Sequence, residues 1–254
     1  MATETVLIVG STGHIGTSAA QGALKAGLSV LAIVRNARSA EKLFRNLGSK
    51  ERITTVEADV TSPTGVQCVV DQVKAGRLPA FQHVYSCVGG PYDAESLYDL
   101  DDNKFLENMT FTFYPNFYAY RATIPYLLAQ NHPNSTWTIC TGGQGDIGAR
   151  PGAGMAQGAL YSMSTSAARQ NKETNIRFNE VYLFMRVEVD AEAEAHGVQK
   201  ASHFANVYET LLSRNDVRSA RVLVTREEDL DVLRFEYKDQ KLLEVGTRLL
   251  GAFD

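Results

Sequence analysis

The sequence contains few cysteines, and their spacing is not that of metal ligands. Cys68, Cys87 and Cys140 are the three cysteines among 254 residues, and none belongs to a CxxC pair. Cys87 and Cys140 stand in apolar segments that are typical of strands. We therefore expect buried free thiols in a reducing compartment and no metal site.

Long hydrophobic segments and a large net charge are also lacking. No apolar segment approaches the ~20 residues of a membrane-spanning helix. The N-terminal sequence MATETVLIVG leads directly into a strand pattern, without the basic segment of a secretory leader. The formal net charge of −4 gives no reason to expect nucleic acid or an anionic membrane as a partner. We expect a soluble, cytoplasmic protein.

Apolar segments alternate with helical patterns along the chain. Continuous β-branched runs, such as TVLIVG at 5–10, are typical of strands buried on both faces. Further strands are expected at 28–35, 52–59, 81–89, 135–141, 175–184 and near 220–225. Helices are expected after the first strand and at about 39–47, 66–76, 102–130 (bent near Pro115), 154–171 and 200–213. This order predicts a doubly wound, Rossmann-like α/β fold, a parallel sheet with helices on both faces, formed by residues 1–254 as a single domain.

A glycine-rich turn follows the first strand and begins a helix. In this context, glycines allow a tight turn and a close approach to a pyrophosphate, whose charge the N-terminus of the helix stabilises. A turn that only packs the helix is the alternative, and His14 is expected to be an exposed loop residue rather than a catalyst. The predicted phosphate-binding residues are Gly10, Ser11, Thr12, Gly13, His14, Ile15 and Gly16.

The end of the second strand is basic where an acidic residue would bind the ribose of NAD. Arg35 and Arg38 stand there with the small polar residues Asn36 and Ser39. Two guanidinium groups suit a 2′-phosphate, which a carboxylate would repel. We therefore predict NADP(H) as the cofactor, with a solvated basic loop as the alternative.

These residues, and others along most of the chain, resemble the short-chain dehydrogenase/reductase superfamily. NIRFNEV (175–181) resembles the family's sixth strand, and the glycine spacing is closer to its extended and NmrA-like branches. The family's Pro-Gly after that strand is replaced by LFM (183–185). The resemblance implies that Asp59 and Val60 contact the adenine. It also implies a cofactor contact for the segment Cys87, Val88 and Gly89, which stands at the end of the family's Asn-Asn-Ala-Gly motif.

The family's catalytic tyrosine and lysine, one helical turn apart, have no clear counterpart here. Tyr161 is followed four residues later by Thr165 instead of lysine. Counting from the fifth strand and back from the sixth places the family's tyrosine at Ala153, eight positions before Tyr161, and its lysine at Gln157. We therefore expect the match at Tyr161 to be accidental, with an ordinary ketoreductase that uses Tyr161 as the alternative.

The same alignment places the family's serine at Thr141. Its asparagine falls on Asn108 by local sequence and on Thr112 by distance from Pro125. Asp146 lies on the loop that lines the site in this family, so it is a candidate acid or anchor for a cationic substrate; a solvated loop carboxylate is the alternative. The candidate catalytic residues are Thr141, Asp146 and Asn108.

A site without the usual acid favours acceptors that need no proton. Loss of a positioned acid removes about 10²- to 10⁴-fold in rate, whereas hydride transfer to an iminium ion gives a neutral amine directly. We therefore predict an NADPH-dependent reductase of an imine, iminium or other activated acceptor, similar to fungal alkaloid-pathway reductases and cyclases of this superfamily. A non-redox isomerase or cyclase and a non-catalytic NmrA-like NADP sensor remain open.

The substrate is expected to be a small, apolar or aromatic molecule. A flexible acidic segment, 187–200, stands where the family has its substrate lid. Arg121 is either an outward-facing helix residue or a substrate anchor. Candidate pocket walls are Tyr92, Tyr182, Phe184 and Met185. The expected helix at 102–130 carries aromatic residues on more than one face. We expect part of this series to lie in the core and part to form a homo-oligomer interface: Phe111, Phe113, Tyr114, Phe117 and Tyr118.

Overall fold

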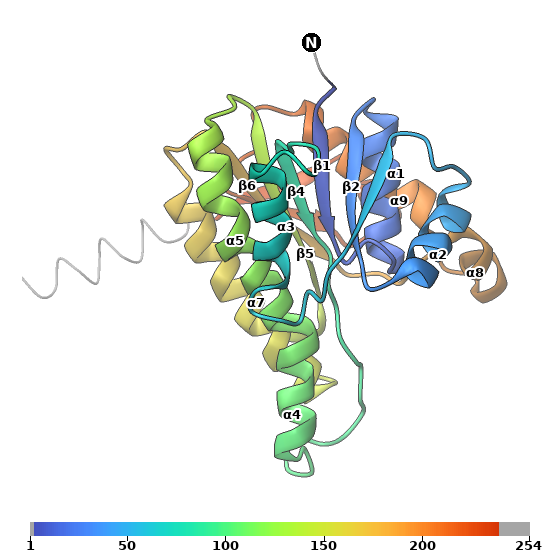
Figure 1. Cartoon of the computed structure of the whole chain (residues 1–254). Helices are drawn as coiled ribbons and strands as arrows, with labels where there is room; N and C mark the ends of the chain where they lie inside the picture. Colours follow the sequence, from blue (N-terminus) through green and yellow to red (C-terminus); the bar gives the residue numbers. More distant parts are fainter. Residues whose placement is uncertain (1–2, 239–254) are drawn as a thin grey trace, which may run out of the picture.

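An eight-stranded sheet forms the centre of the protein, which is described here over residues 3–238 by a computed structural model (Figure 1). The strand order is β10-β9-β6-β5-β4-β1-β2-β3, and every neighbouring pair except β9 and β10 is parallel. The doubly wound α/β fold is therefore confirmed. The strands are β1 (Thr5–Val9), β2 (Ser29–Val34), β3 (Ile53–Glu57), β4 (His83–Ser86), β5 (Ser135–Gly142), β6 (Ile176–Leu183), β9 (Ala220–Val224) and β10 (Arg234–Tyr237).

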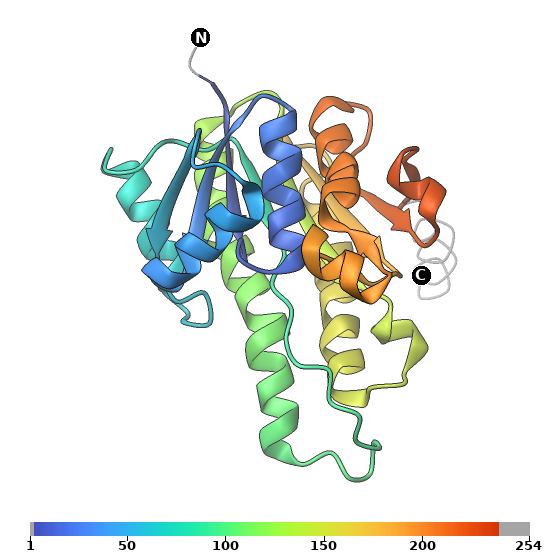
Figure 2. The ribbon, with the colours of Figure 1, turned by 90° about the vertical axis from the view of Figure 1, so that its right-hand side faces the viewer.

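Helices cover both faces of the sheet. One face carries α1 (His14–Lys25), α2 (Ala37–Leu47) and α9 (Ala201–Ser213), and α1 and α9 lie side by side (Figure 2). The other face carries α3 (Gly65–Lys74), α5 (Tyr114–Gln130) and α7 (Pro151–Gln170). Crossover helices connect the parallel strands, as this topology requires.

The two faces of the sheet have separate hydrophobic cores because side chains alternate along each strand. On β6, Val181 and Leu183 pack toward α1 and α9, whereas Ile176 and Phe178 pack toward α5 and α7. All eight residues of β6 are buried, including the polar residues Arg177, Asn179 and Glu180. Trp137 is fully buried, and its indole N–H donates to Thr123 Oγ1 at 2.9 Å, so its one polar group is satisfied.

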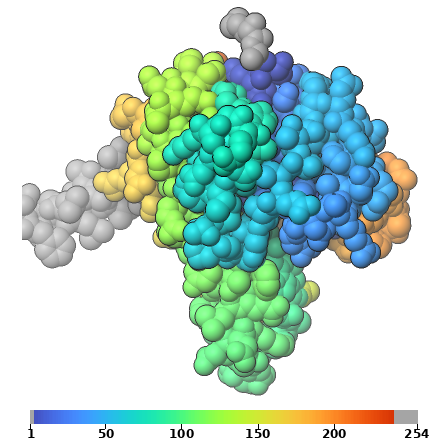
Figure 3. Space-filling model, viewed as in Figure 1, coloured from blue at the N-terminus to red at the C-terminus, as the bar shows by residue number. Residues whose placement is uncertain are grey.

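The helix expected at 102–130 is divided by a wide turn. Asp101 caps α4 (Asp102–Asn108), a π-helical turn (Met109–Phe113) follows, and α5 then begins. Pro115 stands in the first turn of α5, where its missing N–H is tolerated. The expected irregularity therefore lies just before Pro115. The α4 segment projects below the rest of the molecule (Figures 1 and 3).

The segment 187–200 is more regular than a flexible loop. It contains β7 (Val187–Glu188), α8 (Asp190–His196) and β8 (Gln199–Lys200), and β7 pairs in parallel with β8. Shorter elements are α6 (Gln144–Ile147) and a 3₁₀ turn (Glu227–Leu230). Within residues 3–238, no helix combines the length and the hydropathy needed to cross a bilayer.

Candidate active site

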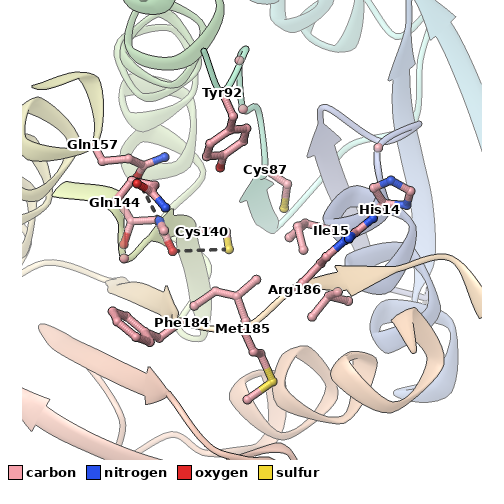
Figure 4. A pocket seen from close by; sticks show the side chains of 18 of the residues that line it. His14, Ile15, Cys87, Tyr92, Cys140, Gln144, Gln157, Phe184, Met185 and Arg186 are labelled. Carbon is pink, nitrogen blue, oxygen red and sulfur yellow. Dashed lines mark hydrogen bonds between the residues drawn. The ribbon is translucent and has the colours of Figure 1, made fainter. Parts of the chain in front are cut away.

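A cavity of about 770 Å³ lies beyond the carboxyl ends of the parallel strands (Figure 4). Its walls come from the turn at 13–15, the segment 87–90 after β4, the end of β5, and residues 183–188 after β6. Tyr92 and Gln157 complete it on the side of α7. Ligands of open α/β sheets bind at this edge, where the strand order reverses between β1 and β4.

The glycine turn has the backbone geometry of a phosphate site. Gly10 has φ +86°, and a β-carbon on Gly16 would lie 2.1 Å from the Gly10 carbonyl oxygen, so neither position accepts a side chain. Gly13 precedes α1 without a side-chain cap, and the first turn of α1 contains no acidic residue. The first backbone N–H groups of α1 are therefore available to an anion. Of the predicted residues, Gly13, His14 and Ile15 line the cavity, and Ser11 Oγ donates to the Ile33 carbonyl at 2.6 Å.

The basic segment after β2 is exposed beside this turn. Asn36 caps α2, since its Oδ1 accepts from the Ser39 backbone N–H at 3.0 Å and from its hydroxyl at 3.1 Å. Arg35 and Arg38 are exposed, and within residues 3–238 neither has a hydrogen bond or a salt bridge. Asp59 accepts hydrogen bonds from the Thr61 hydroxyl and backbone N–H, which hold its pKa below the usual range. Two solvent-exposed guanidinium groups therefore stand at the start of α2, and the charge of Arg35 contributes to the lowered pKa of Asp59.

The cysteines near the cavity are neutral thiols. Cys87 and Cys140 both line the cavity, and Cys87 Sγ lies 3.4 Å from Tyr208 Oη. Burial raises the pKa of Cys87 to about 12, although the Tyr208 hydroxyl partly opposes this. Cys68, in contrast, is exposed on the outer face of α3, so the expectation that all three thiols are buried was wrong for this residue. All three cysteines are free.

The three candidate catalytic residues lie in different surroundings. Thr141 is at the cavity edge, but its hydroxyl donates to Glu180 Oε1 at 2.7 Å. Asp146 accepts a hydrogen bond from the Tyr182 hydroxyl at 2.8 Å and does not line the cavity. Asn108 donates to the Lys104 carbonyl at 2.9 Å between α4 and α7, also outside the cavity. The structure therefore does not bring these three together, and their catalytic roles stay predictions.

Tyr161 lies behind the end of β5 rather than in the cavity. Its hydroxyl donates to the Gly142 carbonyl, and its ring covers Gly145. Burial raises the pKa of Tyr161 well above its usual value, and the charge of Asp146 adds to the effect. Thr165, one turn later, donates its hydroxyl hydrogen to the Tyr161 carbonyl at 3.0 Å.

Gln157 and Tyr92 are the polar side chains that face each other across this part of the cavity (Figure 4). Gln157 Oε1 accepts from the Gly142 N–H at 2.8 Å. Arg150 donates to the Tyr92 carbonyl and so ties the loop after β4 to the start of α7. Gln144 Oε1 is buried beside them, without a hydrogen-bond partner within residues 3–238.

Asn116 is a buried residue that the sequence analysis missed. Its Oδ1 accepts from the Ser86 hydroxyl at 2.6 Å, and its Nδ2 donates to the Val88 carbonyl at 2.9 Å and the Thr112 carbonyl at 2.6 Å. It thereby joins the π-helical turn to the end of β4, where the cavity begins. The available signal was a polar residue within an otherwise aromatic helix segment.

His14 connects the glycine turn to the segment 187–200. Its Nδ1 accepts from the Val189 backbone N–H at 3.1 Å, and its Nε2 lies 3.8 Å from Glu192 Oε2. His14 therefore contacts this segment, whereas the sequence predicted an exposed loop residue. Glu188, at the cavity wall, is held by Arg186 and by His196 Nδ1.

Comparison with known proteins identifies the class of this site. Residues 4–195 match the family model described as short chain dehydrogenase. The chain is also 53% identical over 241 residues to "Short-chain dehydrogenase/reductase iacG" of Pestalotiopsis fici, covering 93% of this chain and 97% of that protein. The chain therefore belongs to the short-chain dehydrogenase family of oxidoreductases.

Solved structures of low sequence identity share the fold. A short-chain dehydrogenase/reductase from Brucella melitensis aligns with a TM-score of 0.72 and 20% identity over 87% of this chain and 94% of that one. A structure described as "ElxO with NADP Bound" aligns with a TM-score of 0.76 and 14% identity, over 88% and 97% of the two chains. These matches support the architecture described above.

Proposed function

We propose that this protein is an NADPH-dependent reductase of the short-chain family in which Tyr161 is not the catalytic acid. The observation that carries the proposal is the hydrogen bond from the Tyr161 hydroxyl to the carbonyl of Gly142, which engages this hydroxyl; Gly142 lines the cavity, whereas Tyr161 does not. Thr165 offers no ammonium group that would lower the pKa of this phenol. Gln157, which faces the cavity, cannot act as an acid in the way a tyrosine does.

The residues of the nucleotide edge fit NADP(H). The uncapped start of α1 suits a pyrophosphate, and Arg35 and Arg38 suit a 2′-phosphate. The protein titled "ElxO with NADP Bound" shows a related fold with this nucleotide. When bound, NADPH would supply a hydride to the acceptor. The chain's own residues would fix the nucleotide and exclude water around the acceptor.

The walls of the cavity suit an apolar acceptor. Ile147, Leu183, Phe184 and Met185 line it, and Phe184 packs against Gly143. An imine, an iminium ion or another activated acceptor would react here without the family's tyrosine and lysine. The resemblance to fungal alkaloid-pathway reductases supports a role in specialised metabolism. A non-redox isomerase or cyclase, or an NADP sensor, would leave the nucleotide unchanged.

The test is to follow NADPH oxidation with N-methyl-3,4-dihydroisoquinolinium, an apolar iminium ion. Transfer of deuterium from NADPH labelled at C4 into the amine product would support a reductase. Tight NADPH binding without oxidation, with this ion or with a panel of activated carbonyl compounds, would contradict the reductase and leave the isomerase or sensor.

We also propose that the protein forms a homo-oligomer. Several large apolar side chains are exposed along α4, the π-helical turn and α5: Leu106, Phe111, Phe117 and Leu128. Phe117 stacks on Phe113 with ring centres 6.0 Å apart, and Arg121 lies over it. Light scattering of wild type and Phe117→Glu tests this, since a charge at the interface would produce monomers.

A further inference from the structure

We propose that Tyr92 and Gln157 together bind the reacting heteroatom of the acceptor, and that Tyr92 donates the proton which that atom takes up. This inference rests on the proposed reductase function. It narrows the acceptor to a carbonyl compound or a neutral imine, whose oxygen or nitrogen has a lone pair. A fully substituted iminium ion has no such lone pair, so its reduction would not depend on Tyr92 and Gln157.

The orientation of the Gln157 amide is fixed by the protein. Its Oε1 accepts the Gly142 N–H at 2.8 Å, so the Nε2 group is the end left for the cavity. No hydrogen bond within residues 3–238 uses Nε2, and the side chain is buried on α7. Gln157 therefore presents a neutral hydrogen-bond donor of defined direction.

Tyr92 is held on the opposite wall by contacts of its loop. Arg150 donates to its carbonyl oxygen, and Lys104 forms an ion pair with Glu95 farther along the same loop. The hydroxyl end of Tyr92 points toward the space between Gln157 and Cys87 (Figure 4). Within residues 3–238 this hydroxyl has no hydrogen-bond partner. A free phenol therefore faces the free amide across the cavity.

The two donors converge on one point beside Gly142. A β-carbon placed on Gly142 would lie 3.8 Å from Tyr92 Oη and 3.8 Å from Gln157 Nε2. An acceptor atom that receives hydrogen bonds from both groups would occupy the space next to this point, because such bonds are about 3 Å long. Two donors aimed at a developing negative charge are the usual means of stabilising it.

The proposed step balances as a two-electron reduction. When bound, NADPH would supply a hydride to the carbon of the C=O or C=N group. The π-electron pair of that group becomes a lone pair on the heteroatom, which Gln157 Nε2 and Tyr92 Oη stabilise. The Tyr92 hydroxyl gives its proton to the heteroatom, and the resulting phenolate recovers a proton from water, which reaches the open cavity because Tyr92 is half-exposed even though its hydroxyl is partly buried. The products are an alcohol or amine and NADP⁺.

The surroundings of Tyr92 keep its hydroxyl protonated. Burial of the hydroxyl raises the pKa of Tyr92, and the nearby Cys140 adds to this while Arg150 opposes it. The phenol therefore carries the proton that its proposed role as donor requires.

The experiment compares wild type with Tyr92→Phe on two matched probes and one carbonyl compound. The probes are 3,4-dihydroisoquinoline, assayed at a pH where it is neutral, and its N-methyl iminium ion; the carbonyl compound is 9,10-phenanthrenequinone. We expect the substitution to lower NADPH oxidation with the neutral imine and the quinone by about 10²- to 10⁴-fold. Turnover of the iminium ion should be unchanged, because that reaction needs no proton.

Two further variants test the geometry. Gln157→Glu keeps the acceptor for the Gly142 N–H but removes the donor, and it should impair the neutral imine and the quinone. Gly142→Ala places a methyl group between the donors at ordinary van der Waals distance, so it should block these acceptors. Fluorescence titration with NADPH shows whether the variant still binds the nucleotide.

The outcomes separate the role of Tyr92 from the proposed reductase function. An equal loss of turnover on all three compounds in Tyr92→Phe, or no loss on any of them, would overturn the role of Tyr92. Turnover of the iminium ion alone by wild type would overturn this inference and leave the proposed reductase intact. If wild type oxidises NADPH with none of the three compounds, the proposed function itself fails.

Discussion

Tyr161 donates its hydroxyl hydrogen to the Gly142 carbonyl oxygen at 2.5 Å, which ties α7 to the end of β5. The Arg221 guanidinium lies 4.7 Å from the centre of the Tyr161 ring, and the Tyr182 ring packs on the same side. The phenol is therefore fixed by packing, charge and a hydrogen bond. This arrangement gives Tyr161 a structural role, which supports the proposal that it is not the catalytic acid.

The guanidinium groups after β2 are expected to select NADPH over NADH. Replacing both Arg35 and Arg38 by Gln should weaken NADPH binding by about 10²- to 10⁴-fold, because each of the two charged hydrogen bonds contributes roughly 1.5–3 kcal/mol. NADH affinity should hardly change. Fluorescence titration with both nucleotides measures this, with Arg45→Gln on the same helix as control. Equal loss for both nucleotides would contradict a 2′-phosphate site.

Two helix glycines are expected to respond oppositely to alanine. Gly16→Ala would place a β-carbon 2.1 Å from the Gly10 carbonyl oxygen, so it should lower stability and abolish nucleotide binding. Gly158→Ala meets nothing within 4 Å on α7 and should stabilise the protein by roughly 0.5–1 kcal/mol. Urea unfolding of both variants measures the difference. Equal stability of the two variants would show that the turn is not tightly packed.

The carboxylate of Asp229 is expected to make stability depend on pH. Burial raises its pKa, but hydrogen bonds from Arg234, Thr225 and Arg226 outweigh burial and hold the pKa below that of an unfolded chain. The ionised Asp229 carboxylate therefore stabilises the folded state above pH ~4. This stabilisation is lost as the pH falls through the pKa of Asp229 in the folded protein.

Asp229→Asn should therefore lose about 3–5 kcal/mol at pH 7 and progressively less in acid. Asp216→Asn, in an exposed pair with Arg214, should change the stability little at any pH. Urea unfolding from pH 7 to pH 3 provides the comparison. A loss for Asp229→Asn that does not shrink as the pH falls would show that its charge is not responsible.

The contact between His14 and Val189 is expected to hold the segment 187–200 against the glycine turn. His14→Ala removes the acceptor for the Val189 N–H, so amide hydrogen exchange should accelerate in β7 and α8. Exchange in β4 and β5 should remain as in wild type. Unchanged exchange in β7 and α8 would show that other contacts hold this segment.

The sequence predicted the elements whose pattern is local. The strands β1 and β2 at the centre of the sheet are buried and are nearly continuous apolar runs, and the glycine turn has a fixed spacing. It did not predict β10, which is short, partly exposed and contains Arg234 and Glu236. The π-helical turn at Met109–Phe113 was not predicted, because the bend in this helix was expected at Pro115 and the residues before the proline carry no such signal.

The site was harder to predict because it depends on tertiary contacts. Tyr92 was considered only as an apolar wall, since nothing in an irregular loop shows where its hydroxyl points. Gln157 was identified as the residue in the family's lysine position, but its hydrogen bond to Gly142 requires the fold. The roles of Thr141, Asp146 and Asn108 remain predictions, and Thr141 alone lines the cavity.

The central claim is that Tyr161 does not supply the proton, and single-turnover kinetics of Tyr161→Phe test it most directly. NADPH oxidation is followed at 340 nm after rapid mixing of the NADPH complex with 9,10-phenanthrenequinone. We predict a rate constant close to that of wild type, with stability lower by about 0.5–1.5 kcal/mol for the lost hydrogen bond. A fall of about 10²-fold or more in a folded variant that still binds NADPH would contradict the account.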